Sequence, residues 1–346
     1  ATSVYDTMVE ALQYKNTHQD PSTGNSRVVT LTEIVDSGSN AGSNDNVSAL
    51  SIASTVTLAA TNDAPTATAG TTLAYSENGT AAVVDNTIAL SDADDSQMAG
   101  ASVTISSGFT SGDILTFTDT ANITGSYNSG SGVLTLSGSD TTANYQAALR
   151  SITYASSSED PTTTATSRTI SWTVTDGNSD GAGAETSTAV TSTINLTAVN
   201  DAPVTTAGAT LAYSENGTAA VIDNTIALSD IDDSQMAGAS VTISSGFTSG
   251  DTLGFTTIGA ISGSYNSSTG VLTLSGTDTI ANYQAALRSI TYASSSEDPT
   301  ATAASRTISW SVTDANSDGA GAQSSSAVTS TINLTATNDT PTATAG

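Results

Sequence analysis

Oxygen-bearing side chains gather in short acidic segments that recur along the chain. The densest is Asp-x-Asp-Asp, found at residues 92–95 and again at 230–233. Carboxylates placed side by side repel one another, and a divalent cation removes that cost. The candidate ligands here are Asp92, Asp94, Asp95, Asp230, Asp232 and Asp233. Because Ca²⁺ takes about six to eight oxygen ligands, calcium is the cofactor that we expect.

Other acidic segments add candidate ligands at equivalent places. Glu-Asn-Gly stands at 77–79 and 215–217, Ser-Glu-Asp-Pro at 158–161 and 296–299, and Asn-Asp at 62–63, 200–201 and 338–339. Each segment could instead be an Asp/Asn-rich turn that ends a strand. The residues that these segments contribute are Glu77, Glu159, Asp160, Glu215, Glu297, Asp298, Asn62, Asp63, Asn200, Asp201, Asn338 and Asp339.

One further segment, Asp-x-Asn-x-Asp-Gly, occurs at 176–181 and 314–319. It matches the first half of the calcium loop of helix–loop–helix proteins and offers Asp176, Asn178 and Asp180. The closing Glu is missing at the expected spacing, since Glu185 comes too early and its copy is Gln323. The segment therefore indicates a cation, but not a helical calcium sensor.

A long internal repeat places all these segments. Residues 62–199 and 200–337 align without a gap, and 114 of the 138 positions are identical. Residues 1–61 match the second half of the same unit more loosely, and 338–346 match its start. A period of this length suits one whole domain per repeat rather than a solenoid unit of about 20–50 residues. We expect half of a divergent repeat, two full domains and the start of another.

Each repeat reads as strands. Ile170, Trp172 and Val174 alternate with polar residues, as in a half-buried strand, and 190–196 alternates in the same way. The turn-rich stretch 127–132 before 133–136 predicts a hairpin. Further strands are expected near 73–76, 81–84, 101–106, 114–117 and 151–155, with a short helical turn at 143–149. This pattern predicts an all-β fold of tandem β-sandwich domains in an extended array.

The expected core of the first full repeat contains its aromatic and aliphatic residues. Trp172 could bind a carbohydrate, but its alternation with apolar neighbours favours the core. The cations Arg150 and Arg168 are expected to pair locally with Asp or Glu. The core list is Tyr75, Phe109, Phe117, Tyr127, Leu134, Leu136, Tyr145, Leu149, Ile152, Tyr154, Ile170, Trp172, Val174, Ile194 and Leu196.

Composition narrows the function. The chain has 33 Asp and Glu against 6 Lys and Arg, a net charge of −27, which argues against nucleic acid and against an anionic membrane surface. With no Cys and one His, the usual zinc and iron–sulfur sites are excluded. No segment approaches the roughly 18 apolar residues of a membrane span, so direct insertion is not expected. His18 has no copy and no nucleophile elbow is present, so we expect no enzyme.

The set of motifs resembles the cadherin-like repeats of giant bacterial surface adhesins, the extender region of RTX-type adhesins. The motifs are Asn-Asp-Ala-Pro, Ser-Glu-Asn-Gly, Asp-Ala-Asp-Asp, and the segment 144–154 that leads to Glu-Asp-Pro. In cadherin-type chains calcium lies where consecutive domains join. The resemblance implies one set of ligands comprising Glu77, Glu159 or Asp160, Asn200, Asp201, Asp230, Asp232 and Asp233. It implies a preceding set comprising Asp20, Asn62, Asp63, Asp92, Asp94 and Asp95.

The expected function is mechanical. Cations that bridge a short linker and its two neighbouring domains would stiffen a string of repeats, whose partners are the adjacent repeats of the same chain. The resemblance implies a calcium-rigidified spacer at the cell surface, outside the cell, that projects a ligand-binding domain. The alternative is a subunit of a self-assembling extracellular fibre or surface layer. In that case identical chains would add strands to the open edges of residues 1–61.

Overall fold

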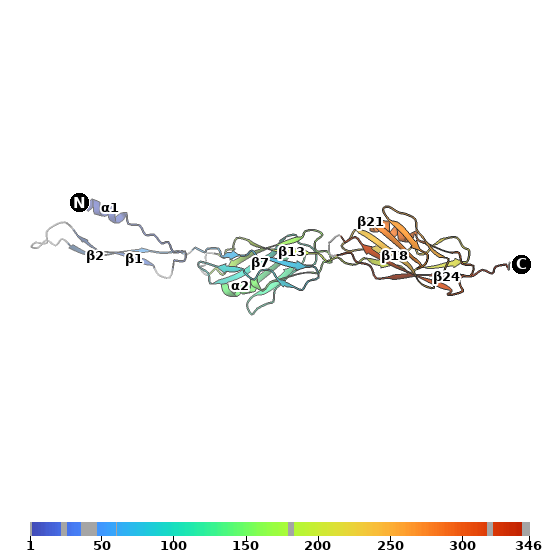
Figure 1. Cartoon of the computed structure of the whole chain (residues 1–346). Coiled ribbons are helices and arrows are strands. Elements are labelled where there is room, and N and C mark those ends of the chain that lie inside the picture. Colours follow the sequence, from blue (N-terminus) through green and yellow to red (C-terminus); the bar gives the residue numbers. More distant parts are fainter. Residues whose placement is uncertain are drawn as a thin grey trace, which may run out of the picture. The chain divides into compact units, whose positions relative to one another are not determined.

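The computed structural model describes residues 2–21, 26–35, 47–59, 61–178, 183–316 and 321–340. Within them the chain is almost entirely β, with two β-sandwiches that share the same order of elements (Figure 1). The all-β tandem sandwich expected from the alternating pattern is therefore confirmed. None of the described helices is long and apolar enough to span a membrane.

The chain divides into two compact units. Unit 1 comprises Ala1–Tyr75, Thr80–Ser156 and Ser167–Asn195. Unit 2 comprises Ser76–Gly79, Ser157–Thr166 and Leu196–Gly346. Unit 2 therefore includes residues 76–79 and 157–166, which lie within the sequence range of the first sandwich.

The first sandwich is built from two main sheets and a short strand pair. Its six-stranded sheet has the order β4-β13-β12-β7-β10-β9, its three-stranded sheet the order β5-β11-β8, and β3 pairs with β6. The elements are β3 Thr66–Thr68, β4 Thr72–Ser76, β5 Ala82–Val83, β6 Ala89–Ser91, β7 Gln97–Ser107, β8 Asp113–Thr116, β9 Thr124–Asn128, β10 Val133–Thr141, α2 Thr142–Arg150, β11 Thr153–Ser156, β12 Ser167–Asp176 and β13 Val190–Thr197.

The second sandwich repeats this topology. Its sheets have the orders β15-β24-β23-β18-β21-β20 and β16-β22-β19, and β14 pairs with β17. The elements are β14 Val204–Thr206, β15 Thr210–Ser214, β16 Ala220–Val221, β17 Ala227–Ser229, β18 Gln235–Ser245, β19 Asp251–Gly254, β20 Ser262–Asn266, β21 Val271–Thr279, α3 Ile280–Arg288, β22 Thr291–Ser294, β23 Ser305–Asp314 and β24 Val328–Thr335.

Residues before the first sandwich form a helix and a hairpin. The helix α1 spans Thr2–Glu10, and the strands β1 Arg27–Val35 and β2 Val47–Val56 pair antiparallel. Several apolar side chains are exposed here, including Val28, Val29 and Ile52. The hairpin therefore lacks, among the described residues, the second layer that covers the equivalent strands of a sandwich.

Trp172 lies in the core, as its alternation predicts. It is fully buried on β12, where every second side chain points inward. Its Nε1 donates to Ser192 Oγ at 3.0 Å, and Ser192 Oγ donates to Asp85 Oδ2 at 2.6 Å. Burial acts to raise the pKa of Asp85, but the hydrogen bonds from Ser192, Gly70 and Thr87 outweigh it and hold that pKa below its ordinary range.

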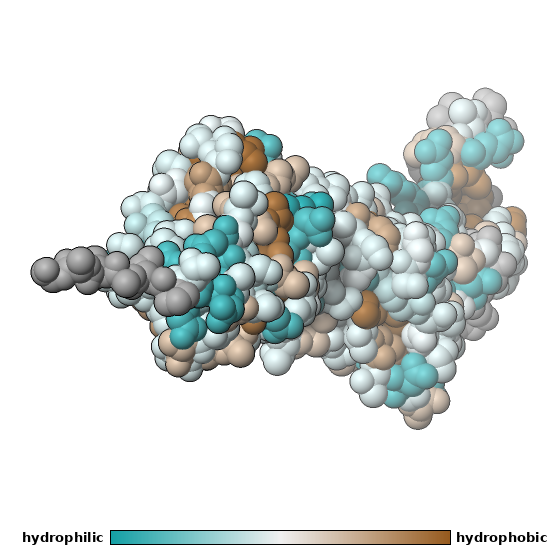
Figure 2. Space-filling model, turned by 90° about the vertical axis from the view of Figure 1, so that its right-hand side faces the viewer, coloured by the Kyte–Doolittle hydropathy of each residue, from teal (hydrophilic) through white to brown (hydrophobic). Residues whose placement is uncertain are grey.

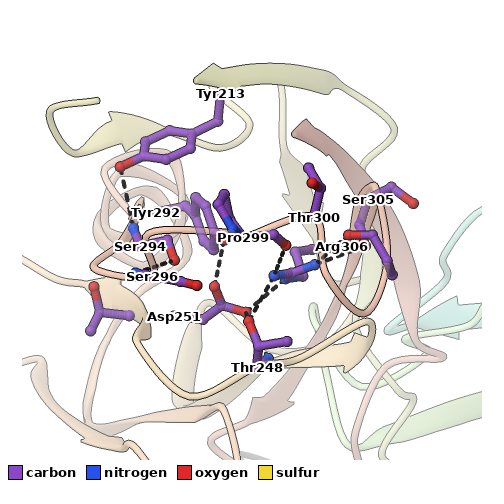
Figure 3. Close-up of polar contacts among 12 residues, drawn as sticks. Tyr213, Thr248, Asp251, Tyr292, Ser294, Ser296, Pro299, Thr300, Ser305 and Arg306 are labelled. Atoms are coloured by element: carbon purple, nitrogen blue, oxygen red, sulfur yellow. Dashed lines mark hydrogen bonds and ion pairs between the residues drawn. The ribbon is translucent and has the colours of Figure 1, made fainter. Parts of the chain in front are cut away.

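Each sandwich also contains one buried ion pair between an arginine and an aspartate. Arg168 Nε and Asp113 Oδ2 lie 2.7 Å apart with both side chains fully buried, and Tyr154 donates to Asp113 at 2.6 Å. Figure 3 shows the copy in the second sandwich, where Arg306 contacts Asp251. The expected pairing with a carboxylate is thus confirmed for Arg168. It is wrong for Arg150, whose Nε donates instead to the carbonyl of Ile88. Arg150 is the last residue of α2, which packs against β6, and Ile88 directly precedes β6.

Three of the expected core residues are only half-buried. Phe109, Phe117 and Tyr127 lie on or beside β8 and β9, which are edge strands of their sheets. The other expected core residues are buried. Figure 2 shows a surface of mostly intermediate hydropathy with scattered apolar spots, as expected where Ser and Thr occupy the outward strand positions.

Candidate cation sites

Three carboxylates of unit 2 converge on one point. Glu77 follows β4, Glu159 lies in the loop between β11 and β12, and Asp201 lies between β13 and β14. One oxygen of each lies within 4.8 Å of the others. We call this group the Glu77 cluster. Asn78, in the left-handed region at φ 55°, forms the turn after Glu77, and its Nδ2 donates to Glu159 Oε2 at 3.2 Å.

Glu77 is the most enclosed member of the Glu77 cluster, with 4% of its surface exposed. Its Oε2 accepts the N–H of Val199 at 2.9 Å, while its Oε1 is buried without a partner among the described residues. Burial, together with the negative charges of Asp201, Glu159 and Asp232, raises the pKa of Glu77 to about 7. A carboxylate in this position lacks a compensating positive charge.

Asp201 connects this cluster to the Asp-x-Asp-Asp segment. Its N–H donates to Asp232 Oδ2 at 2.7 Å, and its own Oδ2 is buried without a partner among the described residues. Burial and the charges of Asp232 and Glu159 raise the pKa of Asp201. This hydrogen bond from the linker between β13 and β14 therefore holds the carboxylate of Asp232 near Glu77.

A second group in unit 2 consists of Asp230, Asp233 and Asp314, and we call it the Asp314 cluster. Oxygens of the three residues also lie within 4.8 Å of one another. Asn200 Nδ2 donates to Asp314 Oδ2 at 2.9 Å. Asn200 is 1% exposed, and its Oδ1 is buried with no partner in the described part of the chain. Three carboxylates therefore lie close together, and the buried amide of Asn200 contacts one of them.

The loop 230–233 is held by its own first residue. Asp230 Oδ1 accepts the N–H groups of Asp232 at 3.3 Å and Asp233 at 3.1 Å. Burial and the neighbouring Asp232 raise the pKa of Asp230 to about 7. Asp314, at the end of β23, accepts the N–H groups of Gln323 and Asn316 and is fully buried.

Unit 1 contains the residues equivalent to the Asp314 cluster, namely Asp92, Asp95 and Asp176, but they are not among the three-carboxylate groups that meet the 4.8 Å limit in the described part of the chain. Asn62 Nδ2 donates to Asp176 Oδ2 at 2.8 Å, and the N–H of Asp63 donates to Asp94 Oδ2 at 2.9 Å. Asp92 Oδ1 accepts the N–H groups of Asp94 and Asp95 at 3.1 and 2.9 Å. Burial raises the pKa of Asp92. The loop geometry of residues 92–95 therefore matches that of 230–233.

The copy of the Glu77 cluster in unit 2 consists of Glu215, Glu297 and Asp339. Their oxygens meet the same 4.8 Å limit. Glu215 Oε2 accepts the N–H of Thr337 at 2.7 Å, and its Oε1 is buried without a partner within the described ranges. Asn338 is exposed.

Several candidate ligands lie outside these groups. Asp160 accepts the N–H of Thr163 at 2.9 Å and Asp298 that of Thr300 at 3.2 Å, so both cap turns. Asn178, at φ 54°, closes its loop by accepting the N–H of Gly183. Asp20 is exposed and belongs to none of the three-carboxylate groups found among the described residues. Asp180 lies outside the described residues.

The donor chemistry fits Ca²⁺. The clusters offer carboxylate and amide oxygens without sulfur or imidazole, which favours a hard cation. The oxygens of Glu77 and Asn200 that lack partners are buried, and buried polar atoms ordinarily find one. Calcium would bring two positive charges to carboxylates that otherwise repel one another. Asp314 was not singled out as a ligand from its sequence; it could have been found as the copy of Asp176.

Comparisons with known proteins give one sequence relative. No protein-family model matches the chain. It is similar to halomucin of Haloquadratum walsbyi, with 35% identity over 128 residues. This covers 35% of the chain and 1% of halomucin, so the chain spans a very small part of that protein.

Structural comparison returns cadherin-type ectodomains at low similarity. The mouse Protocadherin-24 EC1-3 structure has a TM-score of 0.32 and 13% identity, with 85% of this chain and 77% of that one covered. The Protocadherin GammaB4 extracellular domain also has a TM-score of 0.32 and 13% identity, with 84% and 36% covered.

Proposed function

We propose that this chain is a piece of an extracellular adhesion protein in which calcium stiffens a string of β-sandwich repeats. In this role the repeats are structural spacers of a bacterial cell-surface adhesin and hold a ligand-binding domain away from the cell. The carrying observation is the Glu77 cluster, in which loops far apart in sequence bring carboxylates together with buried oxygens that lack partners.

The Glu77 cluster explains how an ion would act mechanically. Glu77 and Glu159 lie in loops between strands of the first sandwich, whereas Asp201 belongs to the linker between β13 and β14. Without a cation their like charges push these segments apart. A cation bound to all three would hold the two loops and the linker in one arrangement. The linker between the two sandwiches would then lose its freedom to bend.

The repeated chemistry favours a structural role over an enzymatic one. The Asp-x-Asp-Asp loop has the same hydrogen bonds at 92–95 and 230–233. An active site needs one set of groups tuned to a reaction, whereas a string of similar joints needs the same ligand set at each. The chain is therefore proposed to be non-enzymatic, with adjacent repeats as its partners.

A second candidate, a self-assembling fibre subunit, is favoured by the hairpin β1–β2. The strand β1 pairs only with β2 among the described residues, and Val28 and Ile52 are 58% and 59% exposed. An open apolar strand can accept a strand from another molecule. Light scattering across a range of protein concentrations separates the two, since a spacer stays monomeric and a fibre subunit polymerises.

Small-angle scattering with and without calcium tests the spacer function. The distribution of distances between repeats should narrow when calcium is added to the wild-type chain. It should stay broad in the variant Glu77→Gln/Glu159→Gln, while Glu10→Gln, an exposed substitution in α1, should behave as wild type. Equal breadth for the wild-type chain in calcium and in chelator would refute the proposal.

A further inference from the structure

The segment before the first sandwich repeats the second half of that sandwich in structure as well as in sequence. The helix α1 corresponds to α2, and the strands β1 and β2 correspond to β12 and β13. Three residue pairs of β1 and β2 have the register of β12 and β13: Arg27↔Val56 as Arg168↔Ile194, Val29↔Ser54 as Ile170↔Ser192, and Leu31↔Ile52 as Trp172↔Val190. The hairpin therefore already has the pairing that these strands have in a complete sandwich.

Apolar side chains of this segment are exposed at positions that are buried in the sandwich. Met8 is 62% exposed, whereas Ala148 at the equivalent position is 4% exposed. Leu12 is 71% exposed, and its equivalent Ile152 is fully buried. Three further exposed residues correspond to fully buried ones, namely Val9 to Leu149, Tyr14 to Tyr154 and Val29 to Ile170. We call the surface formed by Met8, Val9, Leu12, Tyr14 and Val29 the α1–β1 face.

Both complete sandwiches show what covers the equivalent residues. In the first, β12 pairs with β7, β13 pairs with β4, and α2 packs against β6, β7 and β10. In the second, β23 pairs with β18, β24 pairs with β15, and α3 packs against β17, β18 and β21. All the covering strands come from the first half of their repeat, residues 62–141 or 200–279. The occupant that fits the α1–β1 face is therefore the first half of a repeat.

One charge pair makes this fit selective. Arg27 stands at the position of Arg168, whose Nε lies 2.7 Å from Asp113 Oδ2 with both side chains fully buried. Asp113 is the first residue of β8, so the carboxylate comes from the first half of the repeat. A first half that covers the α1–β1 face would bring its aspartate to Arg27, and a buried charge requires such a partner.

We propose that the α1–β1 face is a docking site for the first half of a repeat, supplied by a polypeptide segment outside residues 1–346. A strand equivalent to β7 pairs antiparallel with β1 and places its counterpart of Ile105 opposite Val29, as Ile105 lies opposite Ile170. A strand equivalent to β4 pairs with β2. Docking completes another sandwich, because it buries the apolar side chains of the face and adds strands to the hairpin.

Hydrogen exchange of the full chain, with and without a fragment that has the sequence of residues 62–140, tests the proposal. Amides of β1 and β2 should exchange at least about tenfold more slowly with saturating fragment. Asp113→Asn in the fragment should weaken binding by at least about thirtyfold, because it leaves the arginine buried without its charge partner. Asp119→Asn, which changes an exposed carboxylate of the same fragment, should bind as wild type.

A double-mutant cycle separates a direct ion pair from a general loss of fit. Arg27→Gln in the full chain should weaken the wild-type fragment about as much as Asp113→Asn does. Combining the two substitutions should add little further loss, since the pair is already broken. If the fragment aggregates by itself, the same sequence is fused directly before Ala1, and protection of β1 and β2 is compared between the fusion and its Asp113→Asn variant.

Three results would overturn the proposal. The first is that neither the fragment nor the fusion protects β1 and β2, and the second is that a fragment with the sequence of residues 142–199 protects them equally well. The third is protection that rises with the concentration of the full chain alone, which would identify a second copy as the occupant and favour the fibre candidate. Measurements in chelator as well as in calcium keep this test separate from that of the calcium-stiffened spacer.

Discussion

The pH dependence of stability without calcium follows from Glu77. Its pKa is raised from 4.5 to about 7, chiefly by burial and then by neighbouring carboxylates. Below pH 4.5 the group is protonated in both the folded and the unfolded chain, so the stability that it contributes is at its maximum there. As pH rises, the unfolded chain loses the proton first, and stability falls until pH passes the folded pKa.

The magnitude can be worked from that pKa. A difference of about 2.5 between the folded and unfolded pKa corresponds to about 3 kcal/mol of unfolding free energy, lost between pH 4.5 and 7. Glu77→Gln has no proton to lose and can keep the hydrogen bond from Val199. In chelator at pH 7.5 this variant should therefore be more stable than wild type by up to about 3 kcal/mol.

Urea unfolding in chelator, followed by tryptophan fluorescence between pH 4.5 and 7.5, measures this difference. Glu10→Gln is the matched control, because it removes an exposed carboxylate in α1 far from the clusters in sequence. Part of the pH dependence should remain in Glu77→Gln, since the pKa of Asp230 is also raised to about 7. The reasoning is refuted if Glu77→Gln and wild type lose the same stability across this range.

Three further predictions concern the sandwiches. Arg306→Met should destabilise the second sandwich by about 3–5 kcal/mol in urea melts, because it leaves Asp251 buried without its partner. The control is Arg288→Met, which removes only a hydrogen bond to the carbonyl of Ile226. An equal or smaller loss in Arg306→Met than in Arg288→Met would contradict this prediction. Asp85→Asn should cost about 1.5–3 kcal/mol at pH 7. Because the folded pKa of Asp85 is lowered, this stabilisation is present above pH 3.8 and is lost as pH falls below it, so the two proteins should converge in acid melts. Gly138→Ala should lower the melting temperature, since Gly138 has φ +119° and an added Cβ would lie 1.9 Å from the carbonyl of Asn122; Gly130→Ser, which copies Ser268, should leave it unchanged.

The strands were predictable where burial alternates. On β12 the apolar residues Ile170, Trp172 and Val174 all face the core, and the helix expected at 143–149 is α2. Core residues such as Ile88 and Ile123 were missed because they lie outside the strands, where no alternation marks them. Period-2 patterning identifies long strands better than the turns between them.

The cation sites were predictable as residue types but not as partners. The Asp-x-Asp-Asp segments indicated hard-cation ligands by themselves. Nothing local shows that Asn200 meets Asp314, which is 114 residues away and becomes its neighbour only when β23 is placed in the sheet. Glu159 and Asp160 are adjacent in sequence, yet Glu159 joins a cluster and Asp160 caps a turn. Only the loop conformation decides between them.

A crystal of the chain grown in calcium, with anomalous scattering recorded, tests the central claim most directly. We expect a calcium peak bound by Glu77, Glu159 and Asp201, with metal–oxygen distances of about 2.3–2.6 Å. Well-ordered carboxylates at that position with no anomalous peak, at a calcium concentration that saturates other sites, would contradict the account.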